Sequence, residues 1–199
     1  MHSVYALKAS FQKLLAPIAR RLFLWGVTAN QVTVAAAFAS VGYGLALGFY
    51  PQSHVLWLCL PLFLLARMAM NALDGMLARN YSQASKRGAF LNELCDIASD
   101  AALILGFWGL GAQMPAAIFA VTAALCEAAG LAAQAICGVR RYDGPFGKSD
   151  RAAAMGLSGC VLGFGIDNAI FVQTVLWLCA AGALYTCCRR VEAALKEDT

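Results

Sequence analysis

Charged side chains are scarce in this chain of 199 residues. Asp, Glu, Lys and Arg together make up 13% of it, whereas hydrophobic residues make up 61%. A soluble globular domain usually carries about 25% charged residues, so this composition excludes an ordinary water-soluble domain. The net charge of +4 is modest, and the basic residues are divided among short segments, which argues against nucleic-acid binding. We therefore predict an integral membrane protein with no nucleic-acid partner.

Paired cysteines are also lacking. The chain has eight cysteines, but none of them forms a C-x-x-C pair. This spacing gives no sign of a thiolate metal site or a dithiol redox centre. Nearly all the cysteines lie in apolar segments, where Cys behaves as a small apolar residue.

Six apolar segments, in contrast, are separated by short polar connections. A membrane-spanning helix needs about 20 mostly apolar residues, and the fifth segment is the shortest. We expect the spans at residues 32–50, 54–77, 89–110, 114–138, 152–166 and 168–188. The sequence thus predicts an all-α integral membrane protein with six transmembrane helices.

The basic residues test this number of spans. Of the fifteen Lys and Arg residues, only Arg67 falls inside an expected span. The others precede the first span, follow the sixth, or lie in the connections after the second and fourth spans. All these segments are then on one side of the membrane, which the positive-inside rule makes cytoplasmic. Both termini are expected in the cytoplasm, in a multi-pass protein of a bacterial inner membrane whose basic loops face anionic lipid.

Residues 2–25 alternate apolar and basic side chains at helical spacing. This pattern predicts an amphipathic helix at the cytoplasmic membrane surface, and the alternative is an extension packed on the helix bundle. We expect three parts: a juxtamembrane helix over 1–25, a membrane domain over 26–190 and a cytoplasmic tail over 191–199. Thr28 or Asn30 precedes the first span and is suited to capping it, with ligand contact as the alternative role.

Four carboxylates lie within the expected second and third spans: Asp74, Glu93, Asp96 and Asp100. Carboxylates are costly in hydrocarbon, so such a group indicates a functional site. Asn71 and Asp96 each lie eight residues from the ends of the connection between these spans, Arg79 and Gly88. At 1.5 Å per residue, both side chains are roughly 12 Å from that connection, and antiparallel helices bring them to one depth.

Helical spacing also places these side chains on faces. Asn71 and Asp74 are three positions apart, and Asn92, Asp96 and Asp100 follow at intervals of four, so each set lies along one helix face. Glu93 is one step off that face. Two acidic faces at one depth repel each other unless cations bridge them, and hard divalent ions prefer oxygen ligands. We predict a Mg²⁺ or Mn²⁺ site formed by Asn71, Asp74, Asn92, Asp96 and Asp100.

Cationic and small residues accompany the carboxylates. Gly75 and Ala78 permit close approach of a ligand to the backbone, and Arg79 is suited to bind a phosphate, with anchoring at lipid headgroups as its alternative role. Lys148 and Arg151 form a second candidate phosphate site. Other charged residues have simpler expected roles: Glu127 as a structural hydrogen-bond partner, and Arg67 as a partner of polar groups near the site. Arg140 and Arg141 are expected to be anchors, with phosphate binding as their alternative role.

The pattern Asn71-x2-Asp74-Gly75-x2-Ala78-Arg79-x8-Gly88-x3-Asn92-x3-Asp96 resembles the motif D-x2-D-G-x2-A-R-x8-G-x3-D-x3-D of the CDP-alcohol phosphotransferase family. The spacing agrees at every position, whereas Asn71 and Asn92 stand where the family has aspartates. The stretch G-V-T-A-N-Q-V-T before the first span and Gly147-Lys148-x2-Arg151 also resemble parts of this family.

The resemblance implies an enzyme of phospholipid biosynthesis that transfers a phosphatidyl group from a CDP-linked lipid, expected to be CDP-diacylglycerol, to an acceptor alcohol with release of CMP. It implies two divalent metal ions, a general base at Asp96 or Asp100, and a nucleotide near Gly75, Ala78 and Arg79, with Lys148 and Arg151 at the second phosphate region. It also implies six spans, an active site that faces the cytoplasm and a homodimer.

Two other functions stay open from the sequence. The loss of charge at Asn71 and Asn92 is consistent with a degenerate homologue that binds nucleotide or lipid without turnover. Carboxylates within spans are also found in small ion or proton transporters. The concentration of the carboxylates near one membrane face argues against transport.

Overall fold

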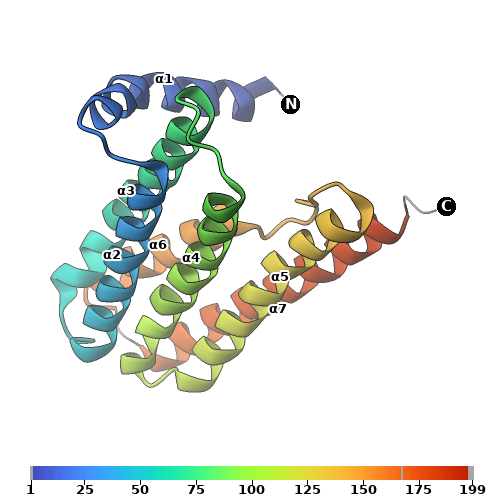
Figure 1. The fold of residues 1–199 in the computed structure, drawn as a ribbon. Coiled ribbons are helices and arrows are strands. Elements are labelled where there is room, and N and C mark those ends of the chain that lie inside the picture. The colour runs from blue at the N-terminus through green and yellow to red at the C-terminus, as the bar shows by residue number, and fades with distance from the viewer. Residues whose placement is uncertain (1, 167, 197–199) are drawn as a thin grey trace. The chain divides into compact units, whose positions relative to one another are not determined.

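The computed structural model describes residues 2–166 and 168–196, in which all the regular structure is helical (Figure 1). The helices are α1 (His2–Leu24), α2 (Ala29–Phe49), α3 (His54–Asn80), α4 (Lys86–Leu105), the 3₁₀ helix η1 (Gly106–Leu110), α5 (Gln113–Cys137), α6 (Lys148–Gly163) and α7 (Ala169–Leu195). The predicted all-α class is therefore confirmed.

The chain forms two compact units. The first unit contains residues up to 39 and 65–96, and the second contains 40–64 and the residues from 97 onward.

Four of these helices are long and apolar enough to cross a membrane: α2, α3, α5 and α7. They correspond to the first, second, fourth and sixth expected spans, and they establish a multi-pass membrane protein. The other two expected spans correspond to α4 and α6. Helix α4 carries Glu93, Asp96 and Asp100, and α6 has only 16 residues, so spanning by these two helices stays a prediction.

The expected third span, 89–110, is divided in the structure. Helix α4 ends at Leu105 and the chain continues as η1. Glycine weakens an α-helix, and here it also permits close packing in the second unit. A Cβ atom on Gly106 would lie 2.9 Å from the carbonyl oxygen of Gly44, and one on Gly109 would lie 2.5 Å from that of Gly48. The backbone segments can approach this closely only because the side chains are absent.

Helix α7 extends beyond the expected sixth span. It continues to Leu195, so most of the predicted tail over 191–199 is helical. The residues after Arg190 include the good helix formers Ala193, Ala194 and Leu195, and Arg189 pairs with Glu192 at 3.2 Å across one turn. The expected connection at Asp167, the first residue and the last three residues of the tail lie outside the described residues.

Helix α1 is held in the first unit by one apolar stripe. Leu15 and Ala19 are buried in a cluster with Leu73 and Leu77 of α3, and Figure 1 shows α1 across the beginning of α2 and the end of α3. Helix α1 is therefore packed within the first unit, while its place at the cytoplasmic membrane surface stays a prediction. The same helix exposes Leu14, with 70% of its surface accessible, so a second apolar face stays available to the membrane surface.

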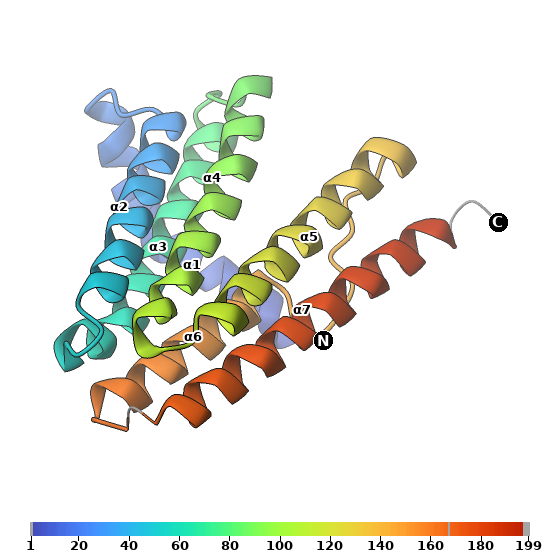
Figure 2. The ribbon, with the colours of Figure 1, turned by 90° about the horizontal axis from the view of Figure 1, so that it is seen from below.

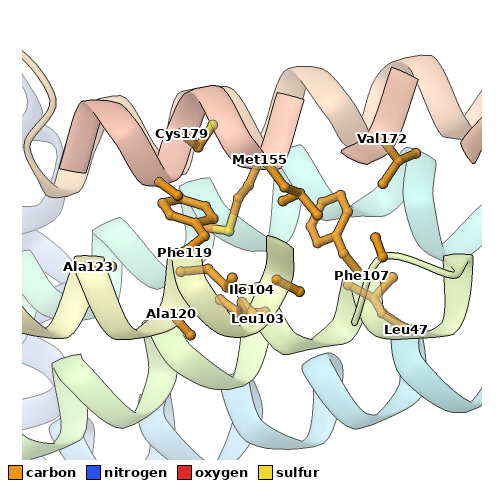
Figure 3. Packing of buried hydrophobic residues seen from close by; sticks show 14 of the residues in the cluster. Leu47, Leu103, Ile104, Phe107, Phe119, Ala120, Ala123, Met155, Val172 and Cys179 are labelled. Carbon is orange, nitrogen blue, oxygen red and sulfur yellow. The ribbon is translucent and has the colours of Figure 1, made fainter. Parts of the chain in front are cut away.

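The core of the second unit is a continuous apolar cluster. Helices α5 and α7 lie side by side along most of their length (Figure 2). The side chains of Phe119 and Met155 lie beside each other in this cluster, which also contains Leu103, Ile104 and Phe107 (Figure 3). This packing fixes the helices that carry the charged residues described below.

Candidate active site

A cavity of about 220 Å³ lies in the first unit, at the end of α3 and the beginning of α4. Helix α2, helix α3, the connection between α3 and α4, and helix α4 all contribute to its wall. Its lining residues are Ala29, Asn30, Thr33, Asp74, Gly75, Ala78, Arg79, Gln83, Ala84, Ser85, Gly88, Ala89 and Asn92. Six residues of the sequence motif are thus brought together in one cavity: Asp74, Gly75, Ala78, Arg79, Gly88 and Asn92.

The beginning of α2 forms one side of this cavity and is tightly capped. The backbone N–H of Thr28 donates to Oε1 of Gln31 at 2.9 Å, and the N–H of Gln31 donates to Oγ1 of Thr28 at 3.3 Å. The predicted capping role of Thr28 is therefore confirmed. The N–H of Ala29 donates to Oε1 of Gln83 at 2.7 Å. This bond attaches the connection between α3 and α4 to the start of α2.

A close approach at Gly88 completes this side of the cavity. A Cβ atom on Gly88 would lie 2.6 Å from Oδ1 of Asn30 and 3.0 Å from Oγ of Ser85. A larger residue would force the side chains of Asn30 and Ser85 to move. Asn30 thus lines the cavity, close to Gly88.

Asp74 is oriented by α2. Its side chain is buried, with 7% of the residue surface exposed, and its Oδ2 accepts a hydrogen bond of 2.9 Å from the hydroxyl of Thr33. The same hydroxyl lies 3.1 Å from the carbonyl oxygen of Ala29, one turn earlier. These contacts hold the carboxylate of Asp74 at the cavity wall, in an apolar helix where it would otherwise be costly.

Asp96 is held by α3. The side-chain amide of Asn71 donates to Oδ1 of Asp96 at 2.9 Å. A nitrogen of Arg67, Nη2, lies 3.6 Å from the same oxygen and 3.3 Å from the backbone carbonyl oxygen of Asp96. The predicted equal depth of Asn71 and Asp96 is confirmed by this contact, as is the expected pairing of Arg67 with polar groups near the site. Asn71 and Asp96 are not among the residues that line the cavity.

Arg79 lies at the end of α3, is exposed, and lines the cavity. Its guanidinium extends back along the helix over Gly75, where a Cβ atom would lie 3.0 Å from Nη2. Gly75 therefore leaves room for the guanidinium beside the cavity. An exposed guanidinium in this position is suited to bind phosphate oxygens.

The second unit contains a separate charged cluster. Nη2 of Arg151 donates to Oδ2 of Asp100 at 2.9 Å and to Oε1 of Glu127 at 2.8 Å. The other carboxylate oxygen of Glu127 lies 3.5 Å from Arg140 and 3.5 Å from Arg190. The expected structural role of Glu127 is confirmed by these contacts. We refer to Asp100, Glu127, Arg140, Arg151 and Arg190 as the ion-pair cluster.

Burial distinguishes this cluster from the cavity. Arg151 has no exposed surface and Asp100 is 5% exposed. The structure thus places both residues in ion pairs, and their predicted roles in phosphate and metal binding stay predictions. Lys148 is half-buried at the first position of α6. The carboxylate of Asp150 caps this helix by accepting from the N–H of Gly147 at 2.9 Å.

Two residues of the cavity region have roles that sequence reasoning missed. Thr33 orients Asp74 from 41 positions away, and Gln83 caps α2 from 54 positions away. A hydroxyl one turn into a span was the available signal for Thr33.

Within residues 2–166 and 168–196, no group of three or more His, Cys, Asp or Glu side chains is close enough to hold a metal ion. A cation bound by these residues would therefore take part of its ligands from amide, hydroxyl, backbone carbonyl or phosphate oxygens or from water.

The chain matches a known family of membrane enzymes. The profile of the CDP-alcohol phosphatidyltransferase family matches residues 26–185. This match covers most of the chain, and the protein belongs to this family of phospholipid-synthesising transferases.

Three similar proteins illustrate the range of the family. The inner membrane protein YnbA of Escherichia coli is 44% identical over 177 residues, which cover 88% of this chain and 85% of the relative. The phosphatidylinositol phosphate synthase of Corynebacterium glutamicum is 32% identical over 195 residues, covering 93% and 85%.

The third is a solved structure. The phosphatidylinositol phosphate synthase PgsA1 of Mycobacterium tuberculosis with CDP-DAG bound is 25% identical, with a TM-score of 0.77, over 92% of this chain and 94% of that one. The same enzyme in complex with manganese and citrate gives a TM-score of 0.75 at 25% identity, over 90% and 88%.

Proposed function

We propose that this protein transfers a phosphatidyl group from CDP-diacylglycerol to an acceptor alcohol and releases CMP. The observation that supports this most directly is the cavity wall, where Asp74, Gly75, Ala78, Arg79, Gly88 and Asn92 meet. These residues are at motif spacing in the sequence and around one space in the structure. The similarity to a synthase solved with CDP-DAG supports the choice of donor.

The side chains at the cavity fit a divalent cation with oxygen ligands. Asp74 provides a carboxylate and Asn92 an amide oxygen at the same cavity, and Asn71 and Asp96 complete the proposed set. Mg²⁺ commonly binds through one or two carboxylates plus phosphate oxygens and water, so this donor set is sufficient for it. Asn71 and Asn92 take the positions of two motif aspartates. When bound, Mg²⁺ or Mn²⁺ supplies charge neutralisation at the pyrophosphate.

The residues of the chain divide the remaining work. Arg79 binds the phosphate oxygens. Gly75 and Ala78 have small side chains and so let the nucleotide approach the backbone of α3 closely. Asp96 accepts the proton of the acceptor hydroxyl as that oxygen attacks the phosphorus, and CMP leaves. Of the two predicted bases, Asp96 suits this role better, because 22% of its side chain is exposed, whereas Asp100 is held by Arg151 at 2.9 Å.

The same proposal includes the membrane arrangement. Helices α2 to α7 form six spans over residues 26–190 with both termini in the cytoplasm, and α1 lies at the inner surface. This arrangement places the cavity and the basic connections on the cytoplasmic side, in keeping with the positive-inside rule. A water-soluble acceptor then meets a lipid donor at the inner leaflet. The functional unit is proposed to be a homodimer.

The test is CMP release by the purified protein. The protein in detergent is given CDP-diacylglycerol, Mg²⁺ or Mn²⁺ and a panel of acceptor alcohols, including inositol phosphate, glycerol phosphate and serine. We expect release with at least one acceptor and its loss, by more than about 100-fold, in Asp74→Asn. If Asp74→Asn keeps the wild-type rate, the proposed site is wrong.

A degenerate homologue is the second candidate, and the two asparagines favour it. If it is correct, the wild-type protein releases no CMP with any acceptor, and only the double variant Asn71→Asp and Asn92→Asp gains activity. Release by the wild-type protein excludes this candidate.

A further inference from the structure

Two short connections of the first unit lead into the wall of the cavity. The connection between α1 and α2 continues directly into Ala29 and Asn30, and the connection between α3 and α4 contains Gln83, Ala84 and Ser85. All five residues line the cavity, whereas residues 11–24 of α1 do not. The distance between the two connections therefore sets the width of the cavity on this side.

Both connections end the preceding helix in the same way. After α1, Gly26 has a φ of 75°, and the N–H of Val27 donates to the carbonyl oxygen five residues earlier at 3.0 Å. After α3, Ser82 has a φ of 55°, and the N–H of Gln83 donates five residues back at 3.1 Å. Each is a helix end in which a left-handed residue turns the chain. A serine adopts this conformation less readily than a glycine, so neighbouring contacts must hold Ser82 in place.

Two contacts join the connections to each other. The ring of Phe23, in the last turn of α1, stacks on the ring of Tyr81, with the centroids 4.5 Å apart and an angle of 24° between the planes. The second contact is the bond of 2.7 Å from the N–H of Ala29 to Oε1 of Gln83. Tyr81 and Gln83 are the two neighbours of Ser82, so the left-handed residue is held on both sides. Figure 1 shows this connection beside α1.

Burial does not explain the orientation of Phe23. The residue is 42% exposed, so the ring is not enclosed in the core. Leu24 and Trp25, which follow it, are 70% and 75% exposed. Of these three large apolar residues, Phe23 is the one whose ring stacks on the α3–α4 connection. A stacked aromatic pair adds stabilisation beyond the area that it buries, and here that stabilisation acts on the segment next to the cavity.

We infer that Phe23 is a positioning residue for the nucleotide side of the cavity. Through Tyr81 it fixes the α3–α4 connection, and residues 83–85 are thereby held at a set distance from the start of α2. Helix α1 thus determines the width of a cavity to which its residues 11–24 contribute no wall. This inference rests on the proposed function for the identity of the ligand, but it concerns a residue outside the cavity and not the reaction.

The first test follows the connection itself by hydrogen–deuterium exchange of the purified protein in detergent. In Phe23→Leu, the amides of residues 81–85 should exchange about 2- to 10-fold faster, the range expected for loss of an aromatic pair, while those of α5 and α7 stay unchanged. Phe23→Tyr keeps the stack and should behave as the wild type. Phe38→Leu, at an exposed position on α2, is the matched control. Equal exchange in Phe23→Leu and Phe38→Leu would overturn the inference.

The second test measures CMP binding by equilibrium dialysis in the presence of Mg²⁺. Phe23→Leu should raise the dissociation constant about 2- to 10-fold, and Phe23→Tyr should restore it. Tyr81→Leu should weaken binding as much as Phe23→Leu does. The double variant should be no weaker than Tyr81→Leu alone, because the two rings act as one pair. Additive losses, an unchanged affinity in Phe23→Leu, or a wild-type protein that binds no CMP would each overturn the inference.

The failure of this inference is distinguishable from failure of the proposed function. Normal CMP affinity in Phe23→Leu, together with CMP release from CDP-diacylglycerol by the wild-type protein, would remove the role of Phe23 and leave the transferase reaction in place. Weakened CMP binding in Phe23→Leu, without CMP release by the wild type for any acceptor, would remove the proposed function and leave the positioning role intact.

Discussion

The cavity in the first unit and the ion-pair cluster in the second both place acidic side chains in apolar helices, but they do so in opposite ways. At the cavity, Asp74 borders open space and accepts from a neutral hydroxyl. In the cluster, Asp100 and Glu127 are closed around a fully buried Arg151. A carboxylate that borders a cavity is available to a ligand, whereas one closed around an arginine is occupied by the protein. The comparison teaches that the presence of an acid in an apolar helix does not by itself identify its role.

Among the variants that test this comparison, the one that removes the proposed general base should change CMP release the most. Asp96→Asn should lower CMP release per folded molecule by about 10²–10⁴-fold, the range for loss of a general base. Because it also removes a carboxylate that contacts the buried Arg67 at 3.6 Å, the thermal unfolding midpoint in detergent should fall as well. The side chain keeps its size and an oxygen that can accept from Asn71. Asp143→Asn, an exposed loop carboxylate, is the control. A rate for Asp96→Asn within threefold of the control would contradict the assignment.

The opposite result is expected in the ion-pair cluster. Glu127→Gln removes the anion that Arg140, Arg151 and Arg190 share, and breaking a buried pair in this way costs about 3–5 kcal/mol. The unfolding midpoint should fall by at least roughly 6 °C, whereas CMP release per folded molecule stays within a few fold. Glu192→Gln changes an exposed carboxylate on α7 and should leave the midpoint unchanged. A thermally normal Glu127→Gln variant that releases no CMP would place the cluster in the active site.

A smaller effect is expected where α2 supports Asp74. Thr33→Val removes the hydroxyl that donates to Oδ2 at 2.9 Å and keeps the shape of the side chain. Loss of such a supporting bond typically costs about 10–100-fold in metal affinity or activity, and we expect about tenfold in the Mn²⁺ dissociation constant. The control is Thr174→Val, which makes the same substitution at an exposed position on α7. An unchanged dissociation constant would show that the hydroxyl does not orient Asp74.

The smallest effect is expected at the connection between α3 and α4. Gln83→Ala removes the cap on the N–H of Ala29, a change worth about 1 kcal/mol. The unfolding midpoint should fall by about 2–4 °C. Gln134→Ala, an exposed glutamine on α5, should cause a smaller shift. Equal midpoints for the two variants would mean that water replaces the cap at no cost.

The sequence allowed the helices and part of the site to be predicted because both depend on local periodicity. Counting eight residues outward from the α3–α4 connection placed Asn71 and Asp96 at one depth, and the structure has them in contact at 2.9 Å. The end of α4 at Leu105 was missed because it depends on how closely Gly106 approaches Gly44. The contacts of Arg151 were missed for a similar reason, since its partner carboxylates are 51 and 24 positions away.

The caps at the start of α2 determine how negative charge is received in the cavity. The electropositive end of a helix dipole is commonly a receptor for phosphate. In α2, however, the amides of Thr28, Ala29 and Gln31 already donate to side chains of the protein. Three donors at that terminus therefore already have partners within the protein. In the proposed reaction, recognition of a diphosphate on this wall then rests mainly on the exposed guanidinium of Arg79 and on a bound ion.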